Sequence, residues 1–270
     1  MAATSRGIQR AVVSCACAAV PCACGTMENG RRWADDATLL PSAERLGHAA
    51  LDALTAPATW LPLAGAAVLQ IDDWDGRISD WAIDKTPIFG SVQNAEDAVG
   101  WTGTLSDSLF YASVAVTPSG EDAGGWFVDK AKGLAVGMGA RVATIVATDL
   151  LKDATGRTRP NGTDDKSMPS SHASGAAVDA TLTVRNVGAT TWPTPVKYAV
   201  DTGVVGFAAL SSWSRVEAGA HFPSDVLVGA ALGHFLGRFF DEAFLRLPEG
   251  VALEPLLAND TYGMTLTFRF

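Results

Sequence analysis

The sequence predicts an all-α protein that folds as one helical bundle. Its 270 residues are 48% hydrophobic and 18% charged, so a chain of this length can bury one sizeable core. Apolar segments of helical length follow one another from residue 42 to about residue 244, several of them opened by Ser or Pro. The one clear strand pattern lies at the C-terminus. We therefore expect a helical core, with any short β-strand confined to the tail.

The first 26 residues differ in character from the rest of the chain. Arg6 and Arg10 precede an apolar run over residues 11–20, and small residues follow it. This order is typical of a secretory signal peptide, and an apolar run of about ten residues is too short to span a bilayer. The pattern predicts a periplasmic or secreted protein from which residues 1–26 are removed.

The cysteines all fall within this leader segment, at Cys15, Cys17, Cys22 and Cys24. Three interpretations remain open. Lipoprotein processing would anchor the protein through Cys15, which follows Val12-Val13-Ser14, and a Cys-x-Cys zinc site would lack a nearby His. The favoured interpretation is that the cysteines are small residues of a discarded leader. In none of these cases does a disulfide framework hold the mature fold.

The rest of the chain is divided by composition into three parts. We expect a polar linker over residues 27–41, a helical domain over residues 42–250 and a C-terminal tail over residues 251–270. Ser42 is the expected cap of the first helix. The charge-free run over residues 53–71 predicts a buried helix, bent by its two prolines.

An acidic segment follows this run, at residues 72–76. It lacks the Glu that would close a calcium-binding loop, so a solvated turn is the better interpretation. An amphipathic helix should come next, with Ile78, Trp81 and Ala82 facing inward.

Three later apolar segments bear on membrane insertion. Arg141 lies in residues 130–151, Asp179 in residues 173–187 and Asp201 in residues 196–213. A charge in the middle of a bilayer is costly, so these segments favour a soluble protein over a membrane-spanning one. The net charge of −9 argues against a nucleic-acid partner, whose binding surface would be basic.

The last nine residues, Tyr262 to Phe270, alternate between apolar and polar side chains, as a half-buried strand does. Bacterial outer-membrane barrels often end in such an aromatic-terminated strand, but one strand cannot close a barrel. We expect a packed C-terminal tail, and an envelope-targeting remnant is the alternative.

Three polar clusters stand out in the second half of the chain. Lys152 is followed by Arg159-Pro160, then come Pro169-Ser170-Ser171-His172, and then Ser214-Arg215 with His221 and Asp225 behind them. Together they supply three cations, two imidazoles, hydroxyls and a carboxylate near expected helix ends, where backbone N–H groups are free. This inventory suits a tetrahedral oxyanion.

Phosphoryl transfer requires charge around the phosphoryl oxygens, a nucleophile in line and a proton donor for the leaving oxygen. The cations and the first turn that begins at Ser171 could meet the first requirement. Asp225 lies one helical turn after His221, so its carboxylate could hold one ring nitrogen and make the other a better nucleophile. The two histidines, His172 and His221, therefore need not have the same role.

These clusters resemble the signature of the type 2 phosphatidic acid phosphatase (PAP2) family, which is shared with bacterial class A acid phosphatases and vanadium haloperoxidases. The signature reads Lys-x6-Arg-Pro, Pro-Ser-Gly-His and Ser-Arg-x5-His-x3-Asp. Every charged and imidazole position of the signature is present here, in order. The one departure is Ser171, which replaces Gly; Ser is tolerated there unless the backbone needs a positive φ.

The resemblance implies an all-α bundle of the PAP2 and vanadium haloperoxidase type, and it implies roles for individual residues. His221 would attack phosphorus to form a phosphohistidine, Asp225 would orient it, and His172 would protonate the leaving oxygen. No metal or other cofactor would be required. The phosphoryl oxygens would be held by Lys152, Arg159, Ser170, the Ser171 amide and Arg215.

We therefore expect a metal-independent phosphatase that acts on phosphomonoesters and works best on the acid side of neutrality. The expected substrates include lipid phosphates and isoprenyl pyrophosphate, and the expected partners include a membrane surface. Substrate identity and oligomeric state carry no sequence signal. The alternatives are a membrane-associated lipid phosphatase or phosphotransferase with the same residues, a vanadium haloperoxidase that holds vanadate, and a non-catalytic phosphate-binding envelope protein.

Overall fold

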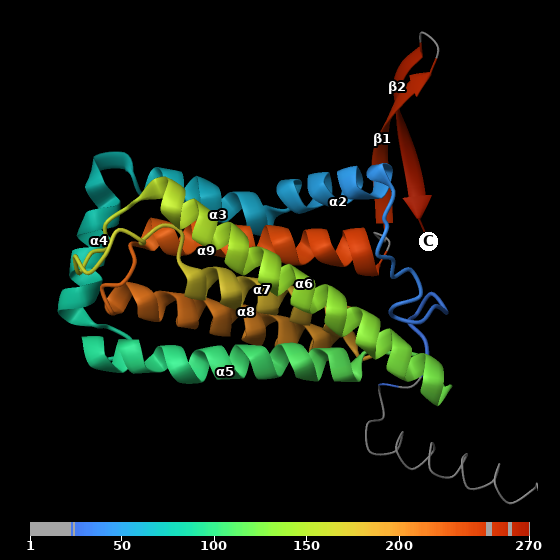
Figure 1. The fold of residues 1–270 in the computed structure, drawn as a ribbon, viewed down its shortest axis with the longest axis horizontal. Coiled ribbons are helices and arrows are strands. Elements are labelled where there is room, and N and C mark those ends of the chain that lie inside the picture. Colours follow the sequence, from blue (N-terminus) through green and yellow to red (C-terminus); the bar gives the residue numbers. More distant parts are fainter. Residues whose placement is uncertain (1–22, 24, 247–249, 259–260, 270) are drawn as a thin grey trace, which may run out of the picture.

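The protein is described here by a computed structural model that covers residues 23, 25–246, 250–258 and 261–269, the last two ranges as backbone only (Figure 1). All four cysteines and nearly all of the expected signal peptide lie outside these residues. The helices are, in chain order, α2 (Ala43–Thr55), α3 (Pro57–Val68), the 3-10 turn η1 (Ile71–Asp73), α4 (Trp74–Lys85), α5 (Val92–Val116), α6 (Ala123–Thr155), α7 (Ser171–Gly188), α8 (Thr194–Glu217), α9 (Pro223–Phe240) and the π turn η2 (Asp241–Leu245).

The helices form one elongated bundle, which confirms the predicted all-α class. Figure 1 shows α5, α8 and α9 along the long axis, with α6 crossing them obliquely. Helix α4 closes one end of the bundle, between α3 and α5. At the same end α6 finishes and α7 and α9 begin, so the three polar clusters of the sequence meet there.

Side-chain caps set several of the helix starts. The Ser42 hydroxyl accepts a hydrogen bond from the Arg45 amide (3.1 Å), which confirms the cap expected for the first helix. Asp122 caps α6 in the same way, because its carboxylate accepts from the Gly125 amide (2.6 Å). Helix α6 thus begins directly after Asp122, seven residues ahead of the apolar segment at residues 130–151 that predicted it.

The largest core cluster lies between α5, α6 and α7 and includes Trp33 from the segment expected to be a linker. The Trp33 ring is almost fully buried. Helix α6 makes room for it at Gly133, where an added Cβ would lie 1.9 Å from a ring carbon. Residues around Trp33 are therefore part of the folded domain.

Helix α3 differs from the expected buried helix. Its buried residues are Thr59 and Ala66, while Trp60, Leu61 and Val68 are exposed. The reason is that α3 packs mainly against α9, with a smaller contact to α2, so much of its apolar surface stays exposed.

Helix α4 also has a different orientation from the one expected. Ala82 is buried as predicted, but Trp81 is half exposed, and the other buried residues are Asp75 and Ser79. A buried carboxylate needs a partner, and Asp75 finds one in Arg157 at 2.7 Å. This ion pair turns the polar face of α4 inward, against the hydrophobic pattern.

The beginnings of α7 and α9 are held together by glycines on α9. An added Cβ at Gly229 would lie 2.6 Å from the Ser170 carbonyl oxygen, and one at Gly233 would lie 2.2 Å from that of Ser174. Both distances are too short for any larger residue. The two helices therefore approach to backbone contact, which fixes the spacing between the second and third polar clusters.

We expect Gly233→Ala to destabilise the protein by roughly 1–3 kcal/mol, because the new methyl group must push α7 away from α9. Gly203→Ala on α8 is the matched control, since nothing lies within 4 Å of its added Cβ. Thermal unfolding of both variants under the same solution conditions would measure the difference. Equal midpoints for the two variants would show that the α7–α9 approach is not constrained by Gly233.

The C-terminal residues form an antiparallel hairpin rather than a packed tail. Strand β1 (Gly250–Ala258) pairs with β2 (Thr261–Arg269), in a register that places Gly250 opposite Arg269. Strand β2 was predicted from its alternating pattern, whereas β1 lacks that alternation and was not. Figure 1 shows the hairpin extending away from the helices.

Candidate active site

The first cluster lies at the end of α6. Lys152 is in the last turn, and its side chain is largely buried. Gly156 ends the helix in a left-handed conformation (φ 53°), and its amide donates to the Lys152 carbonyl (3.0 Å). The chain then turns back toward the bundle, which brings Arg159 to the same end.

The second cluster forms the N-terminus of α7. The buried Ser170 is the cap residue: its hydroxyl accepts from the Ala173 amide (3.4 Å), and its own amide donates to the Asp225 carbonyl (3.0 Å). The first-turn amides of Ser171 and His172 have no acceptor within the helix, so they can bind an anion. Ser171 does not adopt a positive φ, and its replacement of Gly therefore introduces no strain.

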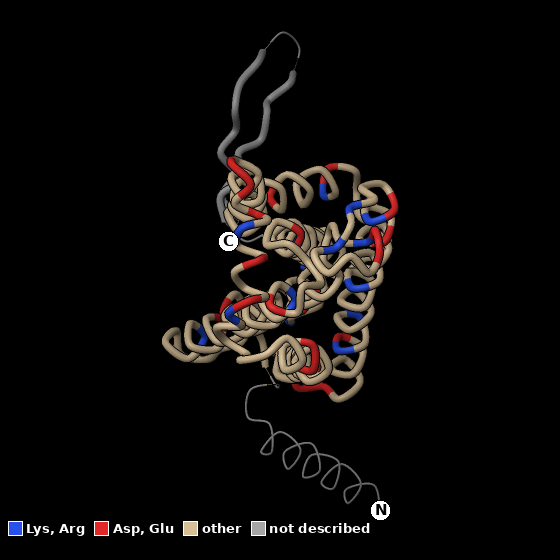
Figure 2. Tube along the Cα trace, turned by 90° about the vertical axis from the view of Figure 1, so that its left-hand side faces the viewer, with Lys and Arg blue, Asp and Glu red and all other residues tan. Residues whose placement is uncertain are grey.

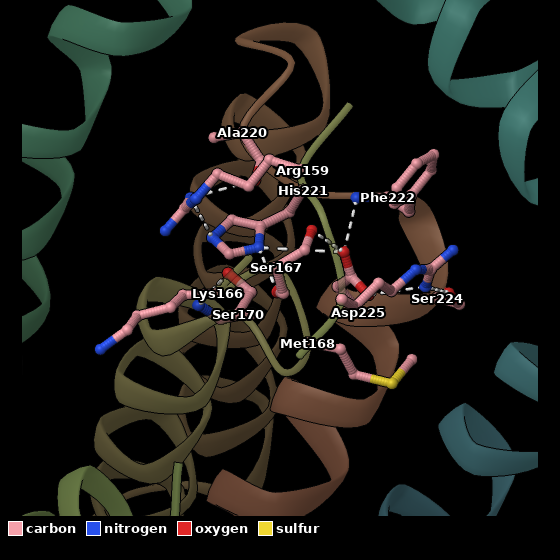
Figure 3. A network of polar contacts seen from close by, with 12 residues as sticks. Arg159, Lys166, Ser167, Met168, Ser170, Ala220, His221, Phe222, Ser224 and Asp225 are labelled. Atoms are coloured by element: carbon pink, nitrogen blue, oxygen red, sulfur yellow. Dashed lines mark hydrogen bonds and ion pairs between the residues drawn. The ribbon is translucent and has the colours of Figure 1, made fainter. Parts of the chain in front are cut away.

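The His221 ring lies just before α9 and is fixed at both nitrogens (Figure 3). Nδ1 is 2.6 Å from the Ser167 carbonyl oxygen, and Nε2 is 3.2 Å from an Arg159 guanidinium nitrogen. A carbonyl only accepts, so we assign the ring proton to Nδ1. The lone pair of Nε2 then accepts a hydrogen bond from the Arg159 guanidinium.

The His221 ring is 1% exposed. Burial and then the charge of Arg159 lower the pKa of His221 to about 3; the Ser167 carbonyl opposes this shift, and the charges of Lys152 and Arg215 add smaller lowering effects. The imidazole is therefore neutral across the ordinary pH range, as a nucleophile must be.

Asp225 does not make the direct hydrogen bond to His221 that was expected. Its Oδ2 is 4.0 Å from Nδ1 of the ring. That oxygen instead accepts from the Ser167 hydroxyl (2.5 Å) and the Phe222 amide (2.8 Å), while Oδ1 accepts from Arg157 (2.7 Å). Because both carboxylate oxygens are occupied, Ser167 stands between Asp225 and the imidazole.

The two arginines of the first and third clusters, Arg159 and Arg215, differ in how their guanidinium groups are held. Arg159 donates to the Ala220 carbonyl (3.0 Å) and pairs with Asp164 (2.6 Å). Arg215 is in the last turn of α8, and its buried Nε has no hydrogen-bond partner among the described residues. A guanidinium with unused donors is suited to an incoming oxyanion. Figure 2 looks onto this end and shows basic residues among the helix connections.

His172 lies in the first turn of α7 and keeps contact with solvent. Partial burial, followed by the charges of Arg215, Lys152 and Arg159, lowers the pKa of His172 below its ordinary value. The same three cations act on both imidazoles. The structure therefore brings the cations and histidines of the sequence prediction into one electrostatic unit.

Three further residues belong to this unit and were missed by the sequence analysis: Ser167, Arg157 and Asp75. Ser167 and Arg157 are next to predicted motifs, but their residue types carry no specific signal. Asp75 is remote in sequence, and only the fold brings it to Arg157. The sequence analysis placed Asp75 in a solvated turn, whereas the structure buries it in the first turn of α4.

Residues 131–245 match the family model of the PAP2 superfamily, and all the predicted site residues lie within that range. A crystal structure titled as the first transmembrane PAP2 type phosphatidylglycerolphosphate phosphatase, from Bacillus subtilis, is 19% identical, with a TM-score of 0.42; the alignment covers 74% of this chain and 100% of that one. No curated protein matches the chain.

The region that carries the three clusters is a PAP2 superfamily region, as its motifs predicted. The family match, together with a helical bundle that gathers cations and two imidazoles at one end, supports a phosphatase.

Proposed function

We propose that the protein is a membrane-associated phosphatase that hydrolyses phosphate esters of lipids through a phosphohistidine at His221. The observation that carries this proposal is the state of the buried imidazole. Its Nδ1 proton is bound by the Ser167 carbonyl, so its unprotonated Nε2 faces Arg159. A neutral nucleophile beside fixed cations is what attack on a phosphate dianion requires.

The reaction has two steps. In the first, Nε2 of His221 attacks phosphorus, the N–P bond forms as the bond to the ester oxygen breaks, and His172 gives its proton to that oxygen. In the second, neutral His172 accepts a proton from water, the water oxygen attacks phosphorus, and the N–P bond breaks. Inorganic phosphate leaves and both imidazoles return to their starting states.

The remaining site residues hold the phosphoryl oxygens in this proposal. Lys152, Arg159 and Arg215 neutralise their charge, and Nε of Arg215, which has no partner within the described part of the chain, can donate to one of them. Ser170 and the Ser171 amide add neutral donors at the start of α7. The proposed chemistry uses these side chains and amides alone, and it requires no metal ion.

The outer surface of α6 supports a lipid environment. Met138, Val142, Val146 and Leu150, spaced one turn apart, are 38%, 55%, 53% and 66% exposed. They line an open apolar groove of about 670 Å³ with Leu236 of α9. Among the described residues α6 is the one helix long and apolar enough to cross a membrane. Exposed apolar patches of this extent mark contact surfaces, and lipid is the natural partner.

Two of the charges that favoured a soluble protein at the sequence level, Arg141 and Asp179, pair with each other in the fold, whereas Oδ1 of the third, Asp201, has no hydrogen-bond partner among the described residues. Arg141 of α6 pairs with Asp179 of α7 at 3.0 Å and also bonds Asp107 of α5. The Asp179 carboxylate accepts from the Ser106 hydroxyl as well (3.1 Å). Paired charges inside a bundle are far less costly in an apolar environment than isolated ones, so they do not oppose membrane association.

We expect kcat/KM to fall as the pH rises above the pKa of His172. The acid form of His172 donates the proton, so activity is lost on deprotonation, and the neighbouring cations place this loss on the acid side. A bound phosphate dianion offsets the charge of those cations and so raises the pKa of His172 in the substrate complex. The falling limb of kcat, which reports that complex, should therefore lie at higher pH than the limb of kcat/KM, which reports the free enzyme. Removing one cation in Lys152→Gln should move the kcat/KM limb to higher pH. A limb unmoved by this variant would contradict the assignment.

The test is phosphate release by the full-length protein from p-nitrophenyl phosphate, phosphatidic acid and isoprenyl pyrophosphate, with a chelator present and His221→Gln beside it. We expect turnover that survives chelation, favours a lipid substrate and disappears in the variant. Cell fractionation should place the protein in membranes, from which detergent but not high salt releases it. No release from any substrate would overturn the proposal, and a protein in the soluble fraction would overturn its membrane part.

A further inference from the structure

Ser167 is placed to control the nucleophile in the proposed function. It is fully buried, and its carbonyl is the acceptor that fixes the His221 ring. Two bonds hold Ser167 itself: its amide donates to the Arg157 carbonyl (2.9 Å), and its hydroxyl donates to Asp225 (2.5 Å). The position of the ring therefore depends on how firmly Arg157 and Asp225 are held.

Arg157 holds Asp225 from the side opposite Ser167. The Asp225 carboxylate is 0% exposed, and burial raises its pKa, while the Ser167 bond and the Arg157 charge lower it. Arg157 pairs with it at 2.7 Å and also donates to the Ser224 hydroxyl (2.8 Å). Its guanidinium lies 4.1 Å above the Phe222 ring. Arg157 thus ties the loop before α7 to the start of α9.

Asp75 in turn holds Arg157. It accepts from the second guanidinium nitrogen of Arg157 at 2.7 Å, and from the Ser224 amide at 2.8 Å. The Ser224 hydroxyl donates to it as well. Asp75 is almost fully buried and comes from α4, outside the residues that match the family model. One planar guanidinium therefore bridges two buried carboxylates from different helices.

We infer that Asp75, Arg157 and Ser167 are positioning residues that hold the His221 imidazole in its Nδ1–H tautomer with Nε2 aimed at the phosphoryl site. This inference rests on the proposed function. The fork geometry matters because a lysine ammonium cannot reach both carboxylates and Ser224 in one plane. The phosphate-binding cations Lys152 and Arg215 are not members of this network.

The test compares Asp75→Asn with the control Asp72→Asn, an exposed acid three residues earlier that lies 3.7 Å from Arg77. Asp75→Asn should reduce kcat by about tenfold to a hundredfold, since small misplacements of reacting groups have effects of this size. KM and inhibition by inorganic phosphate should change less than about threefold, because the cations remain. Asp72→Asn should match the wild type.

Nitrogen-15 NMR of histidine-labelled protein gives a readout that does not need turnover, and the chain has four histidines. His221→Gln assigns the signal. Wild type should show the Nδ1–H tautomer of His221, and Asp75→Asn, Arg157→Lys and Ser167→Ala should each produce a tautomer mixture or a shifted resonance. Arg157→Lys and Ser167→Ala serve as the second and third variants if Asp75→Asn does not fold.

The outcomes separate this inference from the proposed function. If the wild type is inactive but shows the Nδ1–H tautomer of His221, and the variants lose that tautomer, the phosphatase proposal is overturned and the positioning network stands. Normal turnover with a His221 signal and kcat unchanged in the variants would overturn the network. A loss of unfolding temperature with unchanged kcat per folded molecule would also overturn it, since the three residues would then be structural only.

Discussion

Replacing His221 by glutamine is expected to reduce kcat by more than about 10⁴-fold, the largest single effect in the protein. The amide cannot form a phosphoryl intermediate, so the two-step route is lost rather than slowed. Binding should survive, because the cations that hold phosphate are untouched. Phosphate release under single-turnover conditions, combined with inhibition by inorganic phosphate, would separate the two effects.

A labelled substrate sharpens this prediction. Wild-type protein quenched in alkali should retain ³²P on histidine, and His221→Gln should retain none. His48→Gln in α2 is the matched control, because it makes the same change away from the site and should keep both label and turnover. Label that persists in His221→Gln would show that another residue is the nucleophile and would contradict the assignment.

Replacing His172 by asparagine should have the second largest effect, about 10²- to 10⁴-fold on phosphatidic acid. The reason is that an alkoxide leaves poorly unless it is protonated as the phosphorus–oxygen bond breaks. p-Nitrophenolate leaves without a proton, so the replacement should slow the first step much less with p-nitrophenyl phosphate than with phosphatidic acid. Measuring kcat/KM for both substrates therefore tests the role of His172 as proton donor.

The same variant should also slow the second step, since His172 activates the water. Phosphohistidine should then accumulate with p-nitrophenyl phosphate, as a burst of p-nitrophenol followed by slow turnover. An equal loss on both substrates, without a burst, would mean that His172 serves binding or structure instead. His172 is exposed at the start of α7, so its replacement should leave the unfolding temperature unchanged. A lowered unfolding temperature would identify a structural effect.

The helical class and the helix starts at Ser42 and Ser170 could be predicted from the sequence because they depend on local signals. A small polar cap and a long apolar run specify a helix whatever surrounds it. The motif residues were found for a related reason: Lys152, His172 and His221 lie in short patterns whose spacing is visible along the chain. The pairing of Arg141 with Asp179 was not predictable in this way, because it depends on how α6 and α7 pack together.

By itself, the sequence determined the α-helical bundle, and it predicted which residues could bind and transfer a phosphoryl group. Only the tertiary structure decided how His221 is held. Its expected partner Asp225 is one turn away, yet Ser167 takes the bond, because Arg157 and Asp75 occupy and orient that carboxylate from a distant helix. Hydrogen-bond partners of a buried group are chosen by three-dimensional packing, and sequence spacing does not encode that choice.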